Sequence, residues 1–258
     1  VGSSQQTGIG VGVMKNCLII IFAFLVACGS NPSKPEGHLY KEDKSQNIDD
    51  DSREMLNVRM GVAYFERGDY DTALEKLKRA LSYNPKLAIG HSAIATVYST
   101  LNAQLDAERH YKLSVKYGPK DPTILNNYGT YLCQKGDYDQ AVTYYEKTLA
   151  NPFYKTPETV HENVGVCLVQ SAQHEKAEPH FRKALQYNSR LPVSLYNMVV
   201  ISSAKGDNMR ARAFLQRLQN VAALDERILK IGYEVEIKMG NKKAADKYLG
   251  MIRKIKRN

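Results

Sequence analysis

Small and apolar side chains recur along this chain at a fixed interval. Ala73, Ala107 and Ala141 stand 34 residues apart, and Pro85 and Pro119 keep the same interval. A period of about 20–50 residues marks a repeat protein, because one unit is too small to bury its apolar face without a neighbour stacked on it. From residue 54 onward the pattern therefore predicts a solenoid.

The pattern resembles the tetratricopeptide repeat (TPR), in which each repeat is a pair of antiparallel helices. Gly61 and Ala73 are small enough to let the two helices approach closely, while Tyr64 and Leu77 fill the space between them. A proline such as Pro85 ends the second helix. The resemblance implies an all-α TPR solenoid whose hairpins stack into a superhelix.

About six repeats are expected. They span residues 54–87, 88–121, 122–155, 158–191, 192–224 and 225–258. Two residues are inserted after the third repeat, and the match to the pattern weakens in the fifth and sixth repeats. Together these repeats form the predicted TPR domain, residues 54–258.

Upstream of the repeats lies a single apolar run, residues 18–27. As a helix it would cover only about 15 Å, half of a bilayer core, which is typical of a signal peptide. The order Leu25-Val26-Ala27-Cys28 then resembles the bacterial lipobox. It predicts that residues 1–27 are removed and that Cys28 carries the lipid; the alternative is an ordinary signal peptide with a chance cysteine. Residues 1–13 precede Met14 and are expected to lie upstream of the true start.

By the same resemblance, Gly29 after the lipidated cysteine favours the outer membrane, since it is not the aspartate that retains lipoproteins at the inner membrane. Residues 28–53 are polar, contain two prolines and show no period, so they are expected to form a flexible linker of roughly 25–30 Å. We therefore expect a protein anchored by its N-terminal lipid and facing the periplasm.

The chain has a formal net charge of +9, and much of the excess lies at the C-terminus. Only Asp246 opposes the basic residues there, which are Lys242, Lys243, Lys247, Arg253, Lys254, Lys256 and Arg257. Such a segment meets nucleic acid or anionic lipid, or is simply a solvated helix face. Export disfavours nucleic acid, and no nucleic-acid partner is expected.

Two cysteines remain in the repeats, Cys133 and Cys167, each on the first helix of its repeat and 34 residues apart. Facing residues on neighbouring first helices can reach the Cα separation that a disulfide needs, and an exported protein meets an oxidising compartment. We predict one intrachain disulfide; the alternative is a pair of small buried thiols.

The first helices of TPR stacks present repeat positions 2, 5, 9, 12 and 13 to a partner. In the first repeat these positions are largely apolar: Met55, Val58, Val62, Phe65 and Glu66. We predict that this groove receives an apolar peptide or strand, while Asn126 and Gln134 further along offer hydrogen bonds to its backbone. The alternatives are that the linker covers the patch or that the helix phase differs.

Motifs of catalysis are not found in the sequence. There is no Gly-rich phosphate loop, and His161-Glu162 and His174-Glu175 lack the second histidine of a zinc-protease motif. We expect no enzyme, no catalytic residue, no metal, no cofactor and no small-molecule substrate.

Several segments make the resemblance more specific. Asn126-Asn127-Tyr128-Gly129 opens the third repeat, the insertion reads LANPFYKTP, and Glu162-Asn163-Val164-Gly165-Val166-Cys167 follows. With the lipobox, linker and six repeats, they resemble the PilF/PilW pilotins of type IV pilus systems. The resemblance implies a lipoprotein that binds the secretin subunit and promotes its outer-membrane localisation or multimerisation, and thereby twitching motility. The alternative is a TPR lipoprotein scaffold for envelope enzymes or outer-membrane protein assembly.

Overall fold

The structure is a computed structural model, and it describes residues 52–255. The predictions for residues 1–27, for Cys28 and for most of the linker lie outside these residues. Within them the chain is entirely helical, with short turns between twelve α-helices and no strand. The prediction of an all-α solenoid of tetratricopeptide repeats is confirmed.

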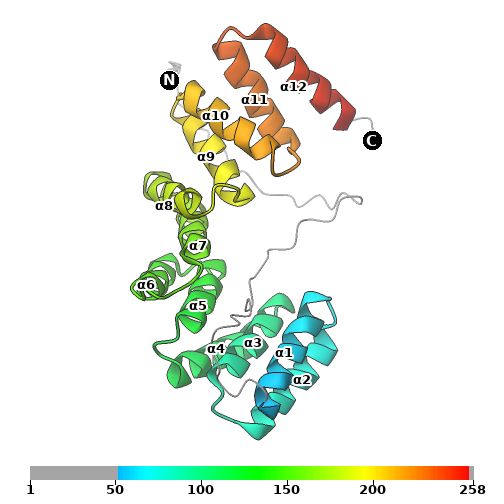
Figure 1. Ribbon diagram of the computed structural model, residues 1–258, viewed down its shortest axis with the longest axis vertical. Coiled ribbons are helices and arrows are strands. Elements are labelled where there is room, and N and C mark those ends of the chain that lie inside the picture. Colours follow the sequence, from blue (N-terminus) through cyan, green and yellow to red (C-terminus); the bar gives the residue numbers. More distant parts are fainter. Residues whose placement is uncertain (1–51, 256–258) are drawn as a thin grey trace, which may run out of the picture. The chain divides into compact units, whose positions relative to one another are not determined.

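The helices form six antiparallel hairpins that follow one another in chain order (Figure 1). Each predicted repeat holds one hairpin, although α1 and α7 begin one residue early. The pairs are α1 (Arg53–Glu66) with α2 (Tyr70–Tyr83), α3 (Ala88–Thr100) with α4 (Gln104–Tyr117), α5 (Pro122–Gln134) with α6 (Tyr138–Leu149), α7 (Pro157–Gln170) with α8 (His174–Tyr187), α9 (Pro192–Ala204) with α10 (Asn208–Gln219), and α11 (Glu226–Lys238) with α12 (Lys242–Ile255).

Capping side chains mark where several helices begin, and residues with positive φ mark where the chain turns between the two helices of a hairpin. The Asp121 carboxylate accepts hydrogen bonds from the first backbone N–H groups of α5, and Asp225 does the same for α11. Every hairpin turn contains one residue with positive φ. Glycine fills this place in four hairpins, but Asn102 and Ala172 fill it in the second and fourth. An alanine at φ 60° is strained, so the fold holds Ala172 there against its own preference.

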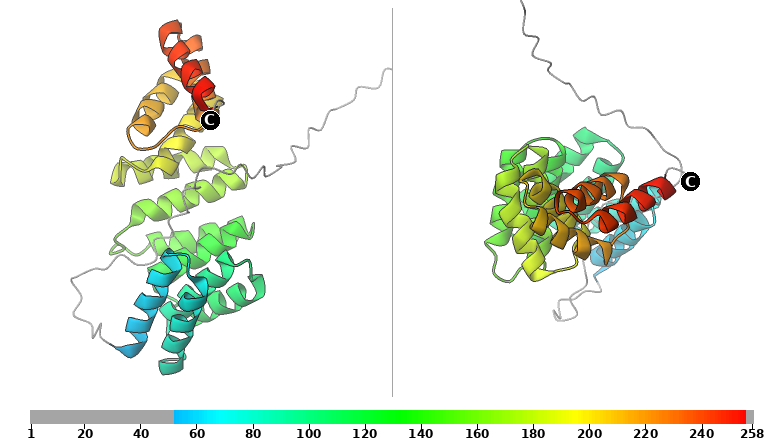
Figure 2. Two further views of the ribbon diagram at one scale, coloured as in Figure 1. Left: turned by 90° about the vertical axis from the view of Figure 1, so that its right-hand side faces the viewer. Right: turned by 90° about the horizontal axis from the view of Figure 1, so that it is seen from above.

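Two layers result from the way the hairpins stack. Each first helix contacts the first helix of the next hairpin, from α1 through α3, α5, α7 and α9 to α11. Among residues 52–255 the backbone of a second helix lies close only to that of its hairpin partner and to that of the first helix that follows it, although a few long side chains, such as Arg210 on α10 and Glu178 on α8, also meet between second helices. Figure 2 shows the hairpins from two further sides. The first helices therefore form one continuous layer, and a partner lying along it meets every repeat.

Tight approach within a hairpin depends on glycine. A Cβ on Gly165 would lie 2.7–2.8 Å from ring atoms of Phe181, which is fully buried. Gly129 faces Tyr145, and Gly232 faces Tyr248, in the same way. Large rings on the second helix thus occupy the space that a missing side chain leaves on the first helix.

A pair of histidines packs between the two helices of the second hairpin, and another pair does so in the fourth hairpin. In the second hairpin Nδ1 of His91 lies 3.0 Å from Nδ1 of His110, and in the fourth Nδ1 of His161 lies 3.2 Å from Nδ1 of His180. His91 Nε2 also lies 3.0 Å from the Pro85 carbonyl oxygen, so it donates there. Within the pair, one Nδ1 donates to the other.

Candidate protein-binding strip

The layer of first helices offers a strip of partly exposed side chains at repeat positions 2, 9, 12 and 13. We call these positions in α1, α3, α5, α7 and α9 the inner strip. Position 13 is exposed in all five helices: Glu66, Thr100, Gln134, Gln170 and Ala204. Positions 2, 9 and 12 are mostly half-buried, as at Met55, Val62 and Phe65. A partner on this layer would therefore touch position 13 first.

Position 5 does not belong to this strip, and here the sequence prediction is corrected. Val58 is 4% exposed and packs in a core cluster with Leu77, Ile94 and Val97. Asn126 is 7% exposed. The reason is the direct contact between neighbouring first helices, which covers position 5. The remaining predicted groove residues, Met55, Val62, Phe65 and Gln134, keep some exposure, and partner contact there stays a prediction.

The inner strip is apolar at both ends and polar in the middle. Met55, Val62 and Phe65 make the first apolar stretch. The middle carries threonine and serine: Thr96, Ser99, Thr123 and Thr130. A second apolar stretch follows on α7 and α9: Val166, Val169, Val193 and Val200. The sequence analysis missed this second stretch, although counting the same repeat positions past the two-residue insertion would have found it.

Polar side chains join the first helices beneath the strip. The side-chain amide of Asn163 on α7 donates to Oδ1 of Asn126 on α5 at 3.2 Å, and the amide of Asn127 donates to the Ser92 hydroxyl on α3 at 3.2 Å. Asn126, predicted to bind a partner, thus uses its carbonyl oxygen to hold the next repeat. One Glu162 oxygen accepts from both the backbone N–H and the hydroxyl of Ser194, at 2.9 and 2.6 Å. This carboxylate joins α7 to the N-terminus of α9, where its charge is favourable.

The two cysteines of the repeats meet between α5 and α7. Cys133 and Cys167 have a Cα–Cα separation of 5.7 Å, and their sulfur atoms lie within bonding distance. This separation is in the middle of the range for natural disulfides. Both side chains are buried, with Cys167 fully so. The geometry fits the predicted disulfide; formation of the bond in the cell stays a prediction.

Tyrosines on the second helices hold two threonines of the strip in place. The Tyr111 hydroxyl lies 3.1 Å from the Thr96 hydroxyl, and the Tyr145 hydroxyl donates to the Thr130 hydroxyl at 3.1 Å. Burial raises the pKa of Tyr111 to about 12, and it also raises the pKa of Tyr145. Both phenols therefore stay neutral and act as structural hydrogen-bonding groups.

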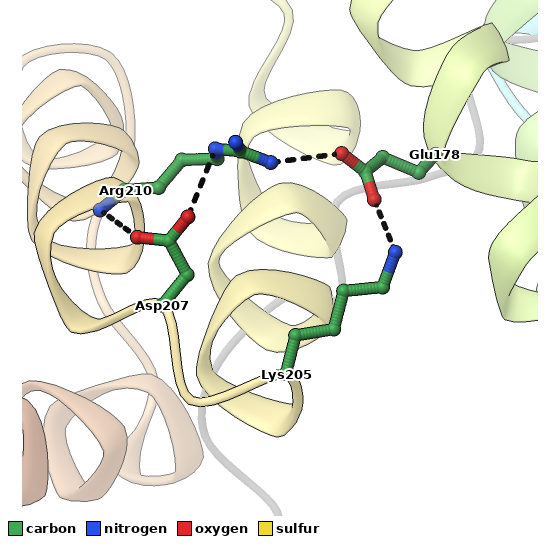
Figure 3. A network of polar contacts seen from close by, with 4 residues as sticks. All are labelled: Glu178, Lys205, Asp207 and Arg210. Carbon is green, nitrogen blue, oxygen red and sulfur yellow. Dashed lines mark hydrogen bonds and ion pairs between the residues drawn. The ribbon is translucent and has the colours of Figure 1, made fainter.

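A charged network joins the fourth and fifth repeats on the other layer (Figure 3). Glu178 on α8 is 8% exposed and accepts from Lys205 Nζ at 2.6 Å and from the Arg210 guanidinium at 3.1 Å. Arg210 also contacts the Asp207 carboxylate at 3.3 Å. The Lys205 hydrogen bond, followed by the charges of Lys205 and Arg210, lowers the pKa of Glu178. This carboxylate therefore fixes one repeat on the next.

Metal-binding clusters and membrane-spanning helices are both absent from the described part of the chain. In residues 52–255, no group of three or more His, Cys, Asp and Glu side chains is placed to hold a metal ion. No helix in that range has both the length and the apolar character to cross a bilayer.

Comparison with known proteins agrees with this arrangement. Two models of the tetratricopeptide repeat match residues 61–102 and 129–192. The chain is therefore an all-α solenoid of tetratricopeptide repeats, and its layer of first helices offers one extended surface.

Within that class the chain is similar to PilF and PilW. It is 25% identical over 211 residues to the type IV pilus assembly protein PilF of Pseudomonas aeruginosa, covering 81% of this chain and 82% of that protein. A solved structure of Pseudomonas aeruginosa PilF has a TM-score of 0.75 at 22% identity, covering 79% of this chain and 91% of that one. The crystal structure of PilW, described as a widely conserved type IV pilus biogenesis factor, has a TM-score of 0.69 at 24% identity, covering 78% and 92%. The resemblance to PilF and PilW is confirmed.

Proposed function

We propose that this chain is a pilotin of a type IV pilus system, a lipoprotein that binds the secretin subunit along the inner strip. In this role it promotes localisation of the secretin to the outer membrane, or its multimerisation there. The observation that carries the proposal is the similarity to a type IV pilus assembly protein along 81% of the chain. It spans the repeats and not one of them alone.

The chemistry of the strip suits an extended segment of a partner protein. Apolar side chains at Val62 and Phe65, and again at Val166 and Val169, would take apolar side chains of the partner. Threonine and glutamine between them can bond to its backbone, because an extended peptide has unpaired N–H and C=O groups. Binding through such a strip needs no catalytic residue, so the proposed pilotin role is that of a binding protein and not of an enzyme.

The proposed anchor is the lipid on Cys28, outside the described residues. A protein held at the outer membrane by its acyl chains brings a bound secretin subunit to the same surface, which raises the local concentration of subunits there. Multimerisation would then follow without a chemical step. Cys28→Ser is expected to leave secretin binding intact in solution and to lower the amount of secretin multimer in the outer membrane.

The strip is tested by substitutions at position 13, because these side chains are exposed and their replacement leaves the core unchanged. Gln134→Arg with Gln170→Arg places two long cations on the strip. The matched control is Gln186→Arg with Gln216→Arg, which adds the same charge to exposed sites on α8 and α10 in the other layer. The strip variant should recover at least tenfold less secretin in a pull-down than the control variant does.

The outcome that contradicts the strip assignment is equal recovery of secretin by the two variants. The outcome that contradicts the pilotin role is a deletion strain in which secretin multimers reach normal amounts in the outer membrane. If envelope enzymes or outer-membrane assembly factors are recovered in place of the secretin, the alternative scaffold role holds.

A further inference from the structure

The last helix carries a face that the solenoid does not use. α12 has five basic residues against the single acidic Asp246. All five are exposed: Lys242, Lys243, Lys247, Arg253 and Lys254. None of them makes an ion pair with the other residues of the described part. The sequence adds Lys256 and Arg257 directly after the described residues.

The cations of α10, one hairpin earlier, are used differently. Arg210 pairs with Glu178, Arg212 contacts Glu236 at 2.9 Å, and Arg217 donates to the Ser189 carbonyl oxygen at 3.1 Å. Basic side chains within the stack thus hold one hairpin against the next. The basic side chains of α12 do not hold one described hairpin against another. The fold therefore does not explain why this helix carries five of them.

Apolar side chains lie beside these cations. Met251 and Ile255 are each 45% exposed and stand four residues apart, so they lie on one face of the helix. Lys247 precedes Met251 by four residues and Lys254 follows it by three, so both cations lie beside Met251 on the side of the pair that faces away from the core. We call Lys243, Lys247, Met251, Lys254 and Ile255 the terminal face.

The core does not account for the terminal face. Ala245, Tyr248 and Ile252 are the buried residues of α12, and the helix packs on α11. The Tyr248 hydroxyl accepts from the Gln219 side-chain amide at 2.9 Å, so this residue is engaged within the stack. Met251 and Ile255 each follow a buried residue, Tyr248 and Ile252, by three positions, so they border the core-facing side and stay open to solvent at its edge.

We propose that the terminal face binds the headgroup region of a bilayer that contains anionic phospholipid. Clustered unpaired lysines attract phosphate groups, and two apolar side chains among them can enter the boundary between headgroups and acyl chains. Charge complementarity is what favours this occupant, because the face carries cations only and their partner must be anionic. Long lysine side chains also reach phosphates while their methylene groups lie on apolar surface.

This inference goes beyond the proposed pilotin function and does not rest on it. The lipid of Cys28 would hold the N-terminal end of the chain, and the terminal face would add a separate contact at the C-terminal end. The contact depends on lipid charge, whereas insertion of an acyl chain does not. The two can therefore be separated by experiment in the full chain.

A single tryptophan reports on the terminal face, because the natural sequence contains none. Met251→Trp in the full chain places the probe on the face, and Met209→Trp on α10 is the matched control at a site that is 70% exposed. Each protein is mixed with phosphatidylcholine vesicles that do or do not contain phosphatidylglycerol. The acyl chains of the lipids are brominated, so that they quench the fluorescence of a tryptophan that enters the bilayer. We expect a blue shift and quenching of the tryptophan at 251 only with phosphatidylglycerol, and reversal by salt.

Charge variants in the Met251→Trp background complete the test. Lys243→Glu, Lys247→Glu and Lys254→Glu together should weaken this vesicle response more than tenfold, while the same three positions changed to Arg retain it. Circular dichroism checks that both variants keep their helices. The proposal is overturned by an equal response on phosphatidylcholine alone, by an equal response at position 209, or by no response at all.

Two further outcomes would assign the face to another occupant and so overturn the proposal. A tryptophan shift of the same size with polyglutamate in place of vesicles would indicate an acidic protein. A shift that grows with protein concentration in the absence of vesicles would indicate a second copy of this chain. Since none of these assays contains secretin, failure of this proposal leaves the pilotin role standing, and the reverse also holds.

Discussion

The third and fourth hairpins, α5–α8, share their backbone fold with the sixth hairpin, α11–α12. The two regions differ in how their side chains are buried and paired. In α5–α8 the rings of Phe181 and Tyr145 are fully buried, and Cys133 and Cys167 meet between repeats. In α12 apolar side chains such as Met251 and Ile255 stay half-exposed, and the lysines make no ion pair with any residue that the structure describes.

The difference follows from position in the stack. A repeat with neighbours on both sides has both of its faces covered, so its side chains are constrained by packing. The sixth hairpin has a neighbour on one side among the described residues, so packing within this part of the chain constrains the side chains on its other side less. Stability should therefore depend on the middle hairpins, and surface chemistry on the last one.

The largest expected effect is the loss of a buried ring from the middle. Phe181→Ala removes a fully buried side chain from the space beside Gly165 and should destabilise α7–α8 by about 3–5 kcal/mol. Ile255→Ala, at a site 45% exposed on α12, should change stability by less than about 0.5 kcal/mol. Hydrogen exchange resolved by helix measures both, and equal losses would remove the distinction between the two regions.

The next effect concerns the link between α5 and α7. If Cys133 and Cys167 are bonded, closing a loop with a sequence separation of 34 should contribute about 3–4 kcal/mol. A reductant should then lower the denaturant midpoint of the wild-type chain. The double variant Cys133→Ser with Cys167→Ser should have a low midpoint that reductant does not change. A wild-type midpoint that is insensitive to reductant would show that the disulfide is absent or contributes nothing.

A smaller effect should come from the histidine pairs, which the last hairpin lacks. Burial, and then the neighbouring ring, lowers the pKa of His110 and of His161 to about 4, and burial lowers that of His180. In the unfolded chain a histidine titrates near 6.5, so the folded state favours the neutral rings. The stability that this preference gives is complete above pH 6.5 and is lost as the pH falls from 6.5 towards 4.

Because the rings are only partly shielded from water, we expect a loss of about 1–2 kcal/mol in each of the two hairpins by pH 5. Hydrogen exchange at pH 7 and pH 5, corrected for intrinsic rates, should show the loss in α3–α4 and α7–α8 but not in α11–α12. The variant His161→Leu with His180→Leu should remove the pH dependence from α7–α8 and leave it in α3–α4. An unchanged dependence in α7–α8 would exclude the pair as its source.

The spacing of small residues was sufficient to predict the hairpins and the approach of Cys133 to Cys167, because both depend on repeat geometry. Burial at position 5 could not be read from one repeat. Val58 and Asn126 are covered by the neighbouring first helix, and the contact depends on how two hairpins stack. The same holds for the hydrogen bond from Asn163 to Asn126, whose partners are 37 residues apart in the chain.

The histidines show a second limit. His91 and His161 occupy a packing position of the repeat, and a single sequence does not tell whether such a ring packs, titrates or binds a ligand. In the structure each lies against a second histidine 19 residues later, and His91 also contacts the Pro85 carbonyl oxygen. Only the three-dimensional arrangement shows that these rings bond to each other.

The smallest expected effect is that of replacing a glycine by alanine, made once in each of the two regions. Gly250 lies in α12, and a Cβ added there meets nothing within 4 Å, whereas a Cβ on Gly165 meets the Phe181 ring. Glycine inside a helix costs about 0.5–1 kcal/mol relative to alanine. Gly250→Ala should therefore raise the stability of α11–α12 by about that amount, while Gly165→Ala should lower that of α7–α8, because an aromatic ring must shift. Denaturation and hydrogen exchange measure the signs. If both substitutions raise the stability of their hairpins, the space beside Gly165 can accept a Cβ. The contrast between closely packed middle hairpins and a more open last hairpin is then wrong.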